Sequence, residues 1–155
     1  MSIPGERVSL EWLILADSAQ VVGNKLYLAG GGWDLLTINT EFPHDQIIGL
    51  AASFGVPWSE TNQPHLAEIS IIDEDGNAPL AKISHQFEVG RPPGMPAGSS
   101  QRTQVAGTLV LRINHAGNYS IRCQVDNEEQ HQRAQFRVVA GPGVVQRQEP
   151  PAASP

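Results

Sequence analysis

Short apolar runs, each interrupted by glycine, proline or asparagine, follow one another along the chain. No window of about 11–18 residues repeats its apolar positions at the helical spacing of three to four. The 155 residues include 15 glycines and 12 prolines, which favour turns over helices. Short strands separated by turn signals at regular spacing are typical of sandwiches and barrels. We therefore expect an all-β fold, a single β-sandwich of about seven to nine strands.

The pattern of alternation places the strands. We expect them at about 8–16, 26–28, 46–56, 66–73, 80–89, 103–113, 118–125 and 130–139. In the first, Val8, Leu10, Trp12 and Ile14 share a face, which predicts that Trp12 lies in the core. In the strand over 46–56, one face carries only small residues from Gly49 to Gly55, so another segment should lie closely across it.

A tyrosine motif characterises the C-terminal half. Gly117-Asn118-Tyr119 enters a strand and resembles the tyrosine corner of immunoglobulin-like sandwiches, in which the phenol bonds to nearby backbone. We therefore expect this half to be immunoglobulin-like, with residues 1–140 forming one domain. The Pro-rich segment 141–155 lacks periodicity, which predicts a disordered tail.

Composition narrows the possible partners and compartment. The formal charge of −6 disfavours attraction to nucleic acid and to anionic membranes. No apolar run approaches the ~20 residues of a membrane helix, and no secretory signal is recognisable. The lone cysteine, Cys123, fits a reducing compartment, so we expect a cytoplasmic protein.

Several segments together resemble a known family. They are L-E-W-L-x-L-A-D-x-A-Q-V followed by G-G-G-W-D, then V-P-W-S-E-T-N, E-V-G-R-P-P-G and G-N-Y, spread over roughly residues 8–140. The chain is similar in these segments to a bacterial family of small single-domain β proteins with no assigned function. The resemblance implies a small β domain and a bacterial source, and it implies no site residues.

Residues that could carry catalysis or bind a metal ion do not form a recognisable set. Cys123 alternates with apolar residues on an inward face, and a buried thiol is a poor nucleophile. The five histidines are far apart in sequence, and His85 on an apolar face reads as a core residue. The acidic turn 73–77 has the Asp-Gly chemistry of a hairpin rather than the ligand spacing of a calcium loop. We therefore expect no enzyme, no cofactor and no metal site.

Two groups of residues remain as candidates for binding a protein. Arg122, Arg133 and Arg137 should point outward from two paired strands as a basic stripe, and Arg112 from the preceding strand is a further candidate for it. Clustered guanidinium groups bind carboxylates and phosphates bidentately, although such a stripe is also compatible with an ordinary solvated sheet face. Trp33 and Trp58 lie at predicted loop edges, where they either pack against loops or mark a contact surface.

The sequence thus favours a non-enzymatic binding or assembly module, with a protein partner or a second copy of the chain as its occupant. The alternative is a small-ligand carrier or an enzyme. Its pocket would lie between the small-residue face of the strand over 46–56 and the loop 57–64.

Overall fold

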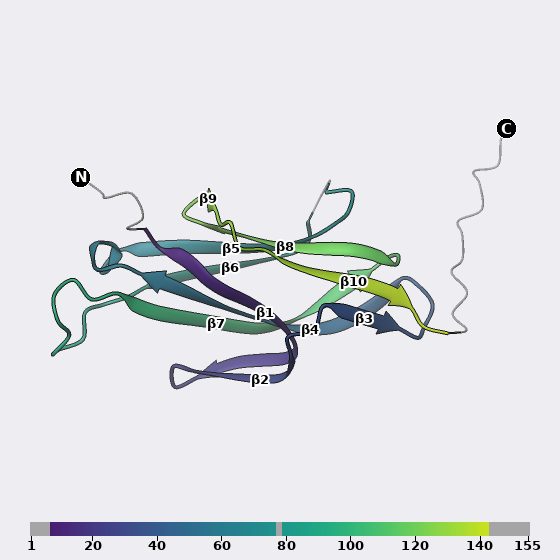
Figure 1. Ribbon diagram of the computed structural model, residues 1–155, viewed down its shortest axis with the longest axis horizontal. Coiled ribbons are helices and arrows are strands. Elements are labelled where there is room, and N and C mark those ends of the chain that lie inside the picture. Colours follow the sequence, from purple (N-terminus) through teal and green to yellow (C-terminus); the bar gives the residue numbers. More distant parts are fainter. Residues whose placement is uncertain (1–6, 77–78, 143–155) are drawn as a thin grey trace.

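Two β-sheets packed face to face form the protein, as expected (Figure 1). The computed structural model describes residues 7–76 and 79–142, and these contain ten strands and one short 3-10 helix. The elements are β1 (Ser9–Val22), β2 (Lys25–Gly31), β3 (Leu35–Ile38), β4 (His44–Val56), η1 (Trp58–Glu60), β5 (Pro64–Asp73), β6 (Pro79–Glu88), β7 (Gln101–Ile113), β8 (Gly117–Val125), β9 (Glu128–Glu129) and β10 (Ala134–Ala140). None of the described residues belong to a helix long and apolar enough to cross a membrane.

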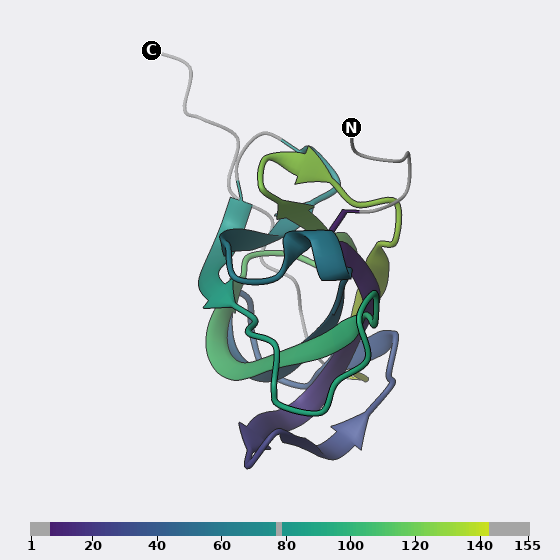
Figure 2. The same ribbon diagram turned by 90° about the vertical axis from the view of Figure 1, so that its left-hand side faces the viewer.

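The first sheet has the strand order β2-β1-β4-β7, and the second has the order β3-β10-β8-β5-β6, with β9 paired to β8. The pairings are antiparallel except that between β3 and β10, which is parallel. Viewed from one end, the two sheets enclose the space between them (Figure 2). The β3 strand was not predicted, because its four residues are too few to show alternation.

The core between the sheets follows from the period of two along each strand. Alternate residues of β4 and β8 point inward and are almost fully buried, among them Ile48, Phe54, Ile121 and Cys123. Tyr119 and Phe136, which are cross-strand partners in β8 and β10, stack at 5.3 Å between ring centroids. The predicted inward faces of these strands are therefore confirmed.

The prediction for Trp12 is wrong. The register between β1 and β4 shifts between Leu10 and Trp12, which marks a β-bulge, and beyond it the two faces of β1 exchange. Leu13 and Leu15 therefore take the core positions, while Trp12 is half-buried on the outer face of the sheet. Because apolar residues occupy both faces of the strand from Trp12 to Leu15, the apolar pattern does not show which face enters the core there.

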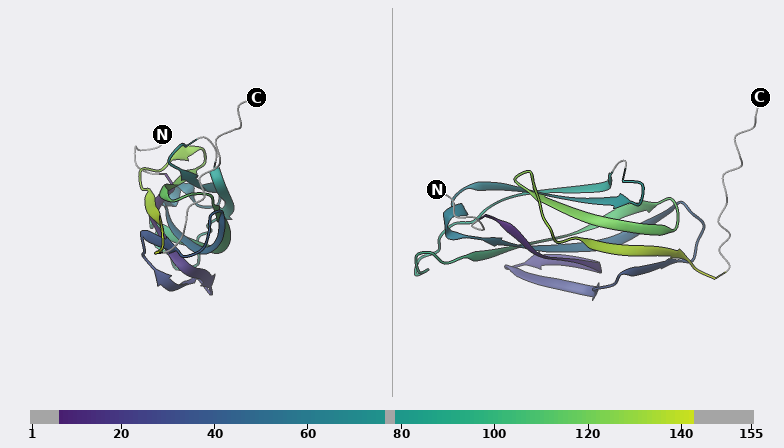
Figure 3. Two further views of the ribbon diagram at one scale, coloured as in Figure 1. Left: turned by 90° about the vertical axis from the view of Figure 1, so that its right-hand side faces the viewer. Right: turned by 45° about the horizontal axis from the view of Figure 1, so that its top comes forward.

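The small-residue face of β4 is covered by β1 itself. A Cβ atom on Gly49 would lie 2.7 Å from the carbonyl carbon of Ser18, so the β1 backbone passes directly over this glycine. Beyond this point β1 continues into its hairpin with β2, which forms the edge of the first sheet and lies away from the second sheet (Figure 3). The prediction that a segment lies closely across this face is confirmed.

The ordered domain extends slightly beyond the predicted boundary at residue 140. The amide N–H of Gly141 donates to the carbonyl oxygen of Ile38 at 2.8 Å, which ties the end of β10 to β3. The remainder of the predicted tail, residues 143–155, lies outside the described residues, as do residues 1–6.

Candidate functional site

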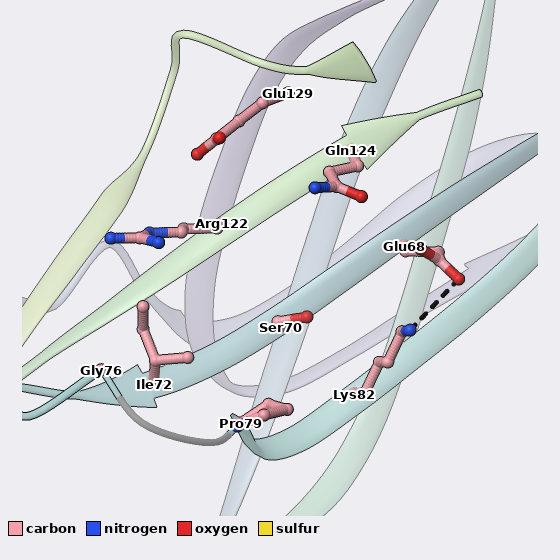
Figure 4. A pocket seen from close by; sticks show the side chains of 9 residues that line it. All are labelled: Glu68, Ser70, Ile72, Gly76, Pro79, Lys82, Arg122, Gln124 and Glu129. Carbon is pink, nitrogen blue, oxygen red and sulfur yellow. Dashed lines mark ion pairs between the residues drawn. The ribbon is translucent and has the colours of Figure 1, made fainter. Parts of the chain in front are cut away.

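The outer face of the second sheet carries a groove of about 290 Å³ across β5, β6 and β8 (Figure 4). Its lining is mainly polar, because the residues between the buried ones of each strand point to this side. The residues that line it are Glu68, Ser70, Ile72, Gly76, Pro79, Lys82, Arg122, Gln124 and Glu129.

Arg122 differs from the other cations of this groove. The ammonium group of Lys82 lies 3.2 Å from the Glu68 carboxylate, and Arg133, beside the groove, bonds to Glu129 at 2.8 Å. The guanidinium group of Arg122 makes no hydrogen bond or ion pair with any other described residue. It therefore remains available to an external carboxylate or phosphate.

The three arginines are all exposed, as alternation predicts, but they do not form one continuous stripe. In the register of β8 and β10, Arg137 faces Asn118, which is four residues along β8 from Arg122. At about 3.4 Å per residue the separation along the strand is roughly 14 Å. Strand β10 begins at Ala134, four residues later than predicted, so Arg133 lies just before it. In the same register Arg133 is closer to Arg122 than Arg137 is.

Arg112 does not join this group. It belongs to β7 of the first sheet, where it forms an ion pair with Asp45 at 3.2 Å. The expectation that it extends the basic stripe is therefore wrong, because the sequence does not reveal which of the two sheets a strand enters.

Both candidate tryptophans are half-buried and pack within the protein. The Trp33 ring meets Phe136 edge-on at 5.8 Å, and Trp33 is packed against the core. The Trp58 ring is covered by the guanidinium group of Arg91, 3.9 Å from the ring centroid. Arg91 is held there by hydrogen bonds to the Thr61 hydroxyl and to the Trp58 carbonyl oxygen. Neither indole lies on the groove around Arg122.

The tyrosine corner is formed as predicted. The Tyr119 hydroxyl donates to the carbonyl oxygen of His115 at 2.6 Å, and the residue is only 2% exposed. Burial raises the pKa of this phenol above its usual value. A separate hydrogen bond, in which the Glu74 carboxylate accepts the Asn118 amide N–H at 2.7 Å, joins the start of β8 to the acidic turn after β5.

His65 is the buried titratable residue that sequence reasoning did not single out. Its Nδ1 lies 2.7 Å from an Asp126 carboxylate oxygen and its Nε2 lies 2.7 Å from the Glu60 carbonyl oxygen. Burial alone lowers the pKa of His65, but these hydrogen bonds and the nearby carboxylates raise it above the ordinary value. Because both partners only accept, the doubly protonated ring satisfies both. Its parity with Ala67 and Ile69 in β5 is the sequence signal that could have indicated an inward position.

The remaining polar candidates have structural roles. Cys123 is fully buried, and burial raises the pKa of its thiol to about 12, which keeps it protonated. His85 is half-buried and stacks on Phe87 at 5.7 Å, and burial lowers its pKa.

The face on which the alternative function depends is occupied by the protein itself. Ser53 is fully buried and donates to the Glu11 carboxylate, which Arg102 binds from β7 at 2.7 Å. This bond with Arg102 is the main reason that the pKa of Glu11 is lowered. Together with the β1 backbone over Gly49, these side chains cover the face that a pocket beside the 57–64 loop would use.

Comparison with known proteins gives a family and a likeness to solved structures. No curated protein matches the chain. A solved structure of the Pseudomonas fluorescens alkylpurine DNA glycosylase AlkC, bound to DNA containing an abasic site analog, is similar at 11% identity with a TM-score of 0.48. The match covers 86% of this chain and 31% of that chain, and at this level it carries no conclusion about function. The model of a family of unknown function, DUF6941, matches residues 11–139, and the chain therefore belongs to that family.

Proposed function

We propose that the chain is a non-enzymatic protein-binding module. Its docking surface is the outer face of the second sheet around Arg122, and its partner presents an acidic segment there. The observation that carries the proposal is that the guanidinium group of Arg122 has no partner among the described residues, whereas neighbouring Lys82 and Arg133 are paired with carboxylates.

The local charge balance supports an acidic partner. Lys82 and Arg133 are each neutralised by a neighbouring glutamate, so Arg122 and the exposed Arg137 contribute the uncompensated charge on this part of the face. A guanidinium group binds a carboxylate through two parallel hydrogen bonds. The uncharged Ser70 and Gln124 beside it offer hydrogen bonds to an extended backbone.

Further parts of the proposal are the setting and the fold type. We place the module in the bacterial cytoplasm and regard its C-terminal half as immunoglobulin-like, on the strength of the Tyr119 corner. The partner is another protein or a second copy of this chain. Analytical ultracentrifugation of the purified chain distinguishes these two cases, because a second copy as partner would make the chain a dimer or larger oligomer.

Affinity capture from a native lysate, followed by binding measurements with each purified captured protein, tests the proposal. The test variant replaces Arg122, Arg133 and Arg137 with serine. The matched control variant removes the same charge elsewhere by replacing Arg7, Arg102 and Arg112 with serine. We expect the control to retain the partner and the test variant to lose it, with binding at least about tenfold weaker.

Binding by the wild-type chain should also weaken as salt rises, because exposed charge pairs are screened over about 8 Å at physiological ionic strength. If the test variant captures the same proteins as the wild type, with the same affinity, the face around Arg122 is not the docking surface.

A further inference from the structure

Two turns that are distant in sequence meet at the end of the second sheet. Asp73 ends β5 and Asp75 follows it in the turn to β6, while His115 lies in the turn from β7 to β8. Because β5 pairs with β8 so that Asp73 faces Tyr119, the end of one strand meets the beginning of the other. One carboxylate oxygen of each aspartate and one ring nitrogen of His115 all lie within 4.8 Å of one another.

The orientation of His115 is fixed by contacts outside this cluster. Its Nδ1 lies 3.0 Å from the carbonyl oxygen of Ala116, which only accepts, so Nδ1 carries the proton of the neutral ring. The ring stacks on Tyr119 at 6.0 Å, and the Tyr119 hydroxyl holds the backbone of the same histidine. The neutral tautomer therefore presents the lone pair of Nε2 toward the aspartates.

The carboxylate of Asp73 is oriented in the same manner. Its Oδ1 accepts the amide N–H of Gly76 at 3.2 Å, which leaves Oδ2 facing His115 Nε2 at 3.9 Å. At that distance the two atoms share no hydrogen bond. Backbone hydrogen bonds to the second atom of a ligating imidazole or carboxylate are the usual way in which proteins orient metal ligands.

We propose that Asp73, Asp75 and His115 bind a divalent transition metal ion of the zinc class. Three electron-rich atoms converge without hydrogen bonds between them, and a cation among them removes their repulsion. One imidazole nitrogen and two carboxylate oxygens are ligands that Zn²⁺ accepts, with water in the remaining position. The nitrogen ligand and the small number of oxygens distinguish the site from a Ca²⁺ loop.

The geometry requires only a small closure. Ligand atoms about 2.1 Å from a tetrahedral ion lie roughly 3.4 Å apart, which is less than the present limit of 4.8 Å. Asp75 is exposed, so its side chain is free to move toward the ion. The bound ion would link the 73–76 turn to the turn before β8. The inference does not rest on the proposed function.

Calorimetric titration of the purified full-length chain with Zn²⁺ alone, at about pH 7 in a buffer that does not chelate metals, tests the site. His115→Ala and Asp75→Asn each remove one ligand. The matched controls are His131→Ala, which removes an exposed histidine elsewhere, and Glu74→Gln, whose parent carboxylate already accepts the Asn118 amide. The ¹⁵N shift of His115 Nε2 provides a second readout, which reports coordination at the nitrogen itself.

We expect one saturable site in the wild-type chain, a change in the Nε2 shift on adding Zn²⁺, and affinity at least about tenfold lower in each ligand variant. Both controls should bind within about twofold of the wild type. The proposal is overturned if the wild-type chain shows no saturable binding below about 1 mM. It is also overturned if His115→Ala binds normally, or if Glu74→Gln weakens binding as much as Asp75→Asn, which would indicate diffuse attraction to an acidic turn.

Discussion

Removal of the Tyr119 hydroxyl isolates the contribution of the tyrosine corner. The hydroxyl donates to the His115 carbonyl oxygen at 2.6 Å from a side chain that is 2% exposed. In Tyr119→Phe the ring keeps its stacking with Phe136 at 5.3 Å, so the substitution deletes the hydrogen bond with little loss of packing. The carbonyl oxygen loses this donor in a partly buried site, and a loss of this kind costs about 1–3 kcal/mol.

Urea denaturation measures this loss directly. With a slope of about 2 kcal/mol per molar urea, the midpoint should fall by roughly 0.5–1.5 M while the slope stays unchanged. Tyr27→Phe is the matched control, because Tyr27 is 52% exposed and its hydroxyl makes no hydrogen bond within residues 7–76 and 79–142. If Tyr119→Phe unfolds within about 0.5 kcal/mol of the wild type, or if both variants lose the same stability, the corner bond does not hold this turn.

Two further predictions concern a close backbone contact and a buried histidine. Gly49→Ala should lower the free energy of unfolding by about 1–3 kcal/mol or more, because the new Cβ would meet the Ser18 backbone. Gly107→Ala is the control: a Cβ there would have nothing within 4 Å, so the free energy of unfolding should change by less than about 1 kcal/mol. Equal urea midpoints for the two variants would contradict the contact at Gly49. Because the folded chain raises the pKa of His65, its protonation stabilises the fold below about pH 6.5 and this contribution is lost as pH rises through the folded pKa. The stability advantage of the wild type over His65→Gln should therefore shrink between about pH 5.5 and about pH 9, and a constant advantage would show that the bond to Asp126 does not depend on the proton.

Local patterns were sufficient to predict the fold class and most strands. The predicted strands over 46–56, 66–73, 80–89 and 103–113 each lie within two residues of the observed bounds of β4 to β7. The turn at Gly23-Asn24 was also predictable, because both residues adopt the positive φ angles of a tight hairpin turn. Alternation and turn chemistry are properties of neighbouring residues, so a single sequence displays them.

Features that depend on distant segments were not predictable in this way. The bulge that moves Trp12 out of the core is a property of the β1–β4 pairing, and the assignment of Arg112 to the first sheet is a property of topology. The convergence of His115 with Asp73 depends on the pairing of β5 with β8, since the two residues are 42 positions apart in sequence. Neither the histidine spacing nor the composition of the acidic turn predicts that contact.

The two outer faces of the sandwich differ in how their charged side chains are paired. On the first sheet, Glu11 pairs with Arg102, Asp45 pairs with Arg112, and the β1–β2 hairpin covers the small residues of β4. The chain therefore pairs these charged groups of the first sheet internally. On the second sheet, Arg122 is left without a partner among the described residues.

The cluster of Asp73, Asp75 and His115 lies at the end of the same sheet, close to a second hollow that Arg122 also lines. Exposed charged groups that make few contacts within the fold add little to its stability. This difference in charge pairing between the two sheets supports placing the proposed acidic partner and the proposed metal ion on the second sheet.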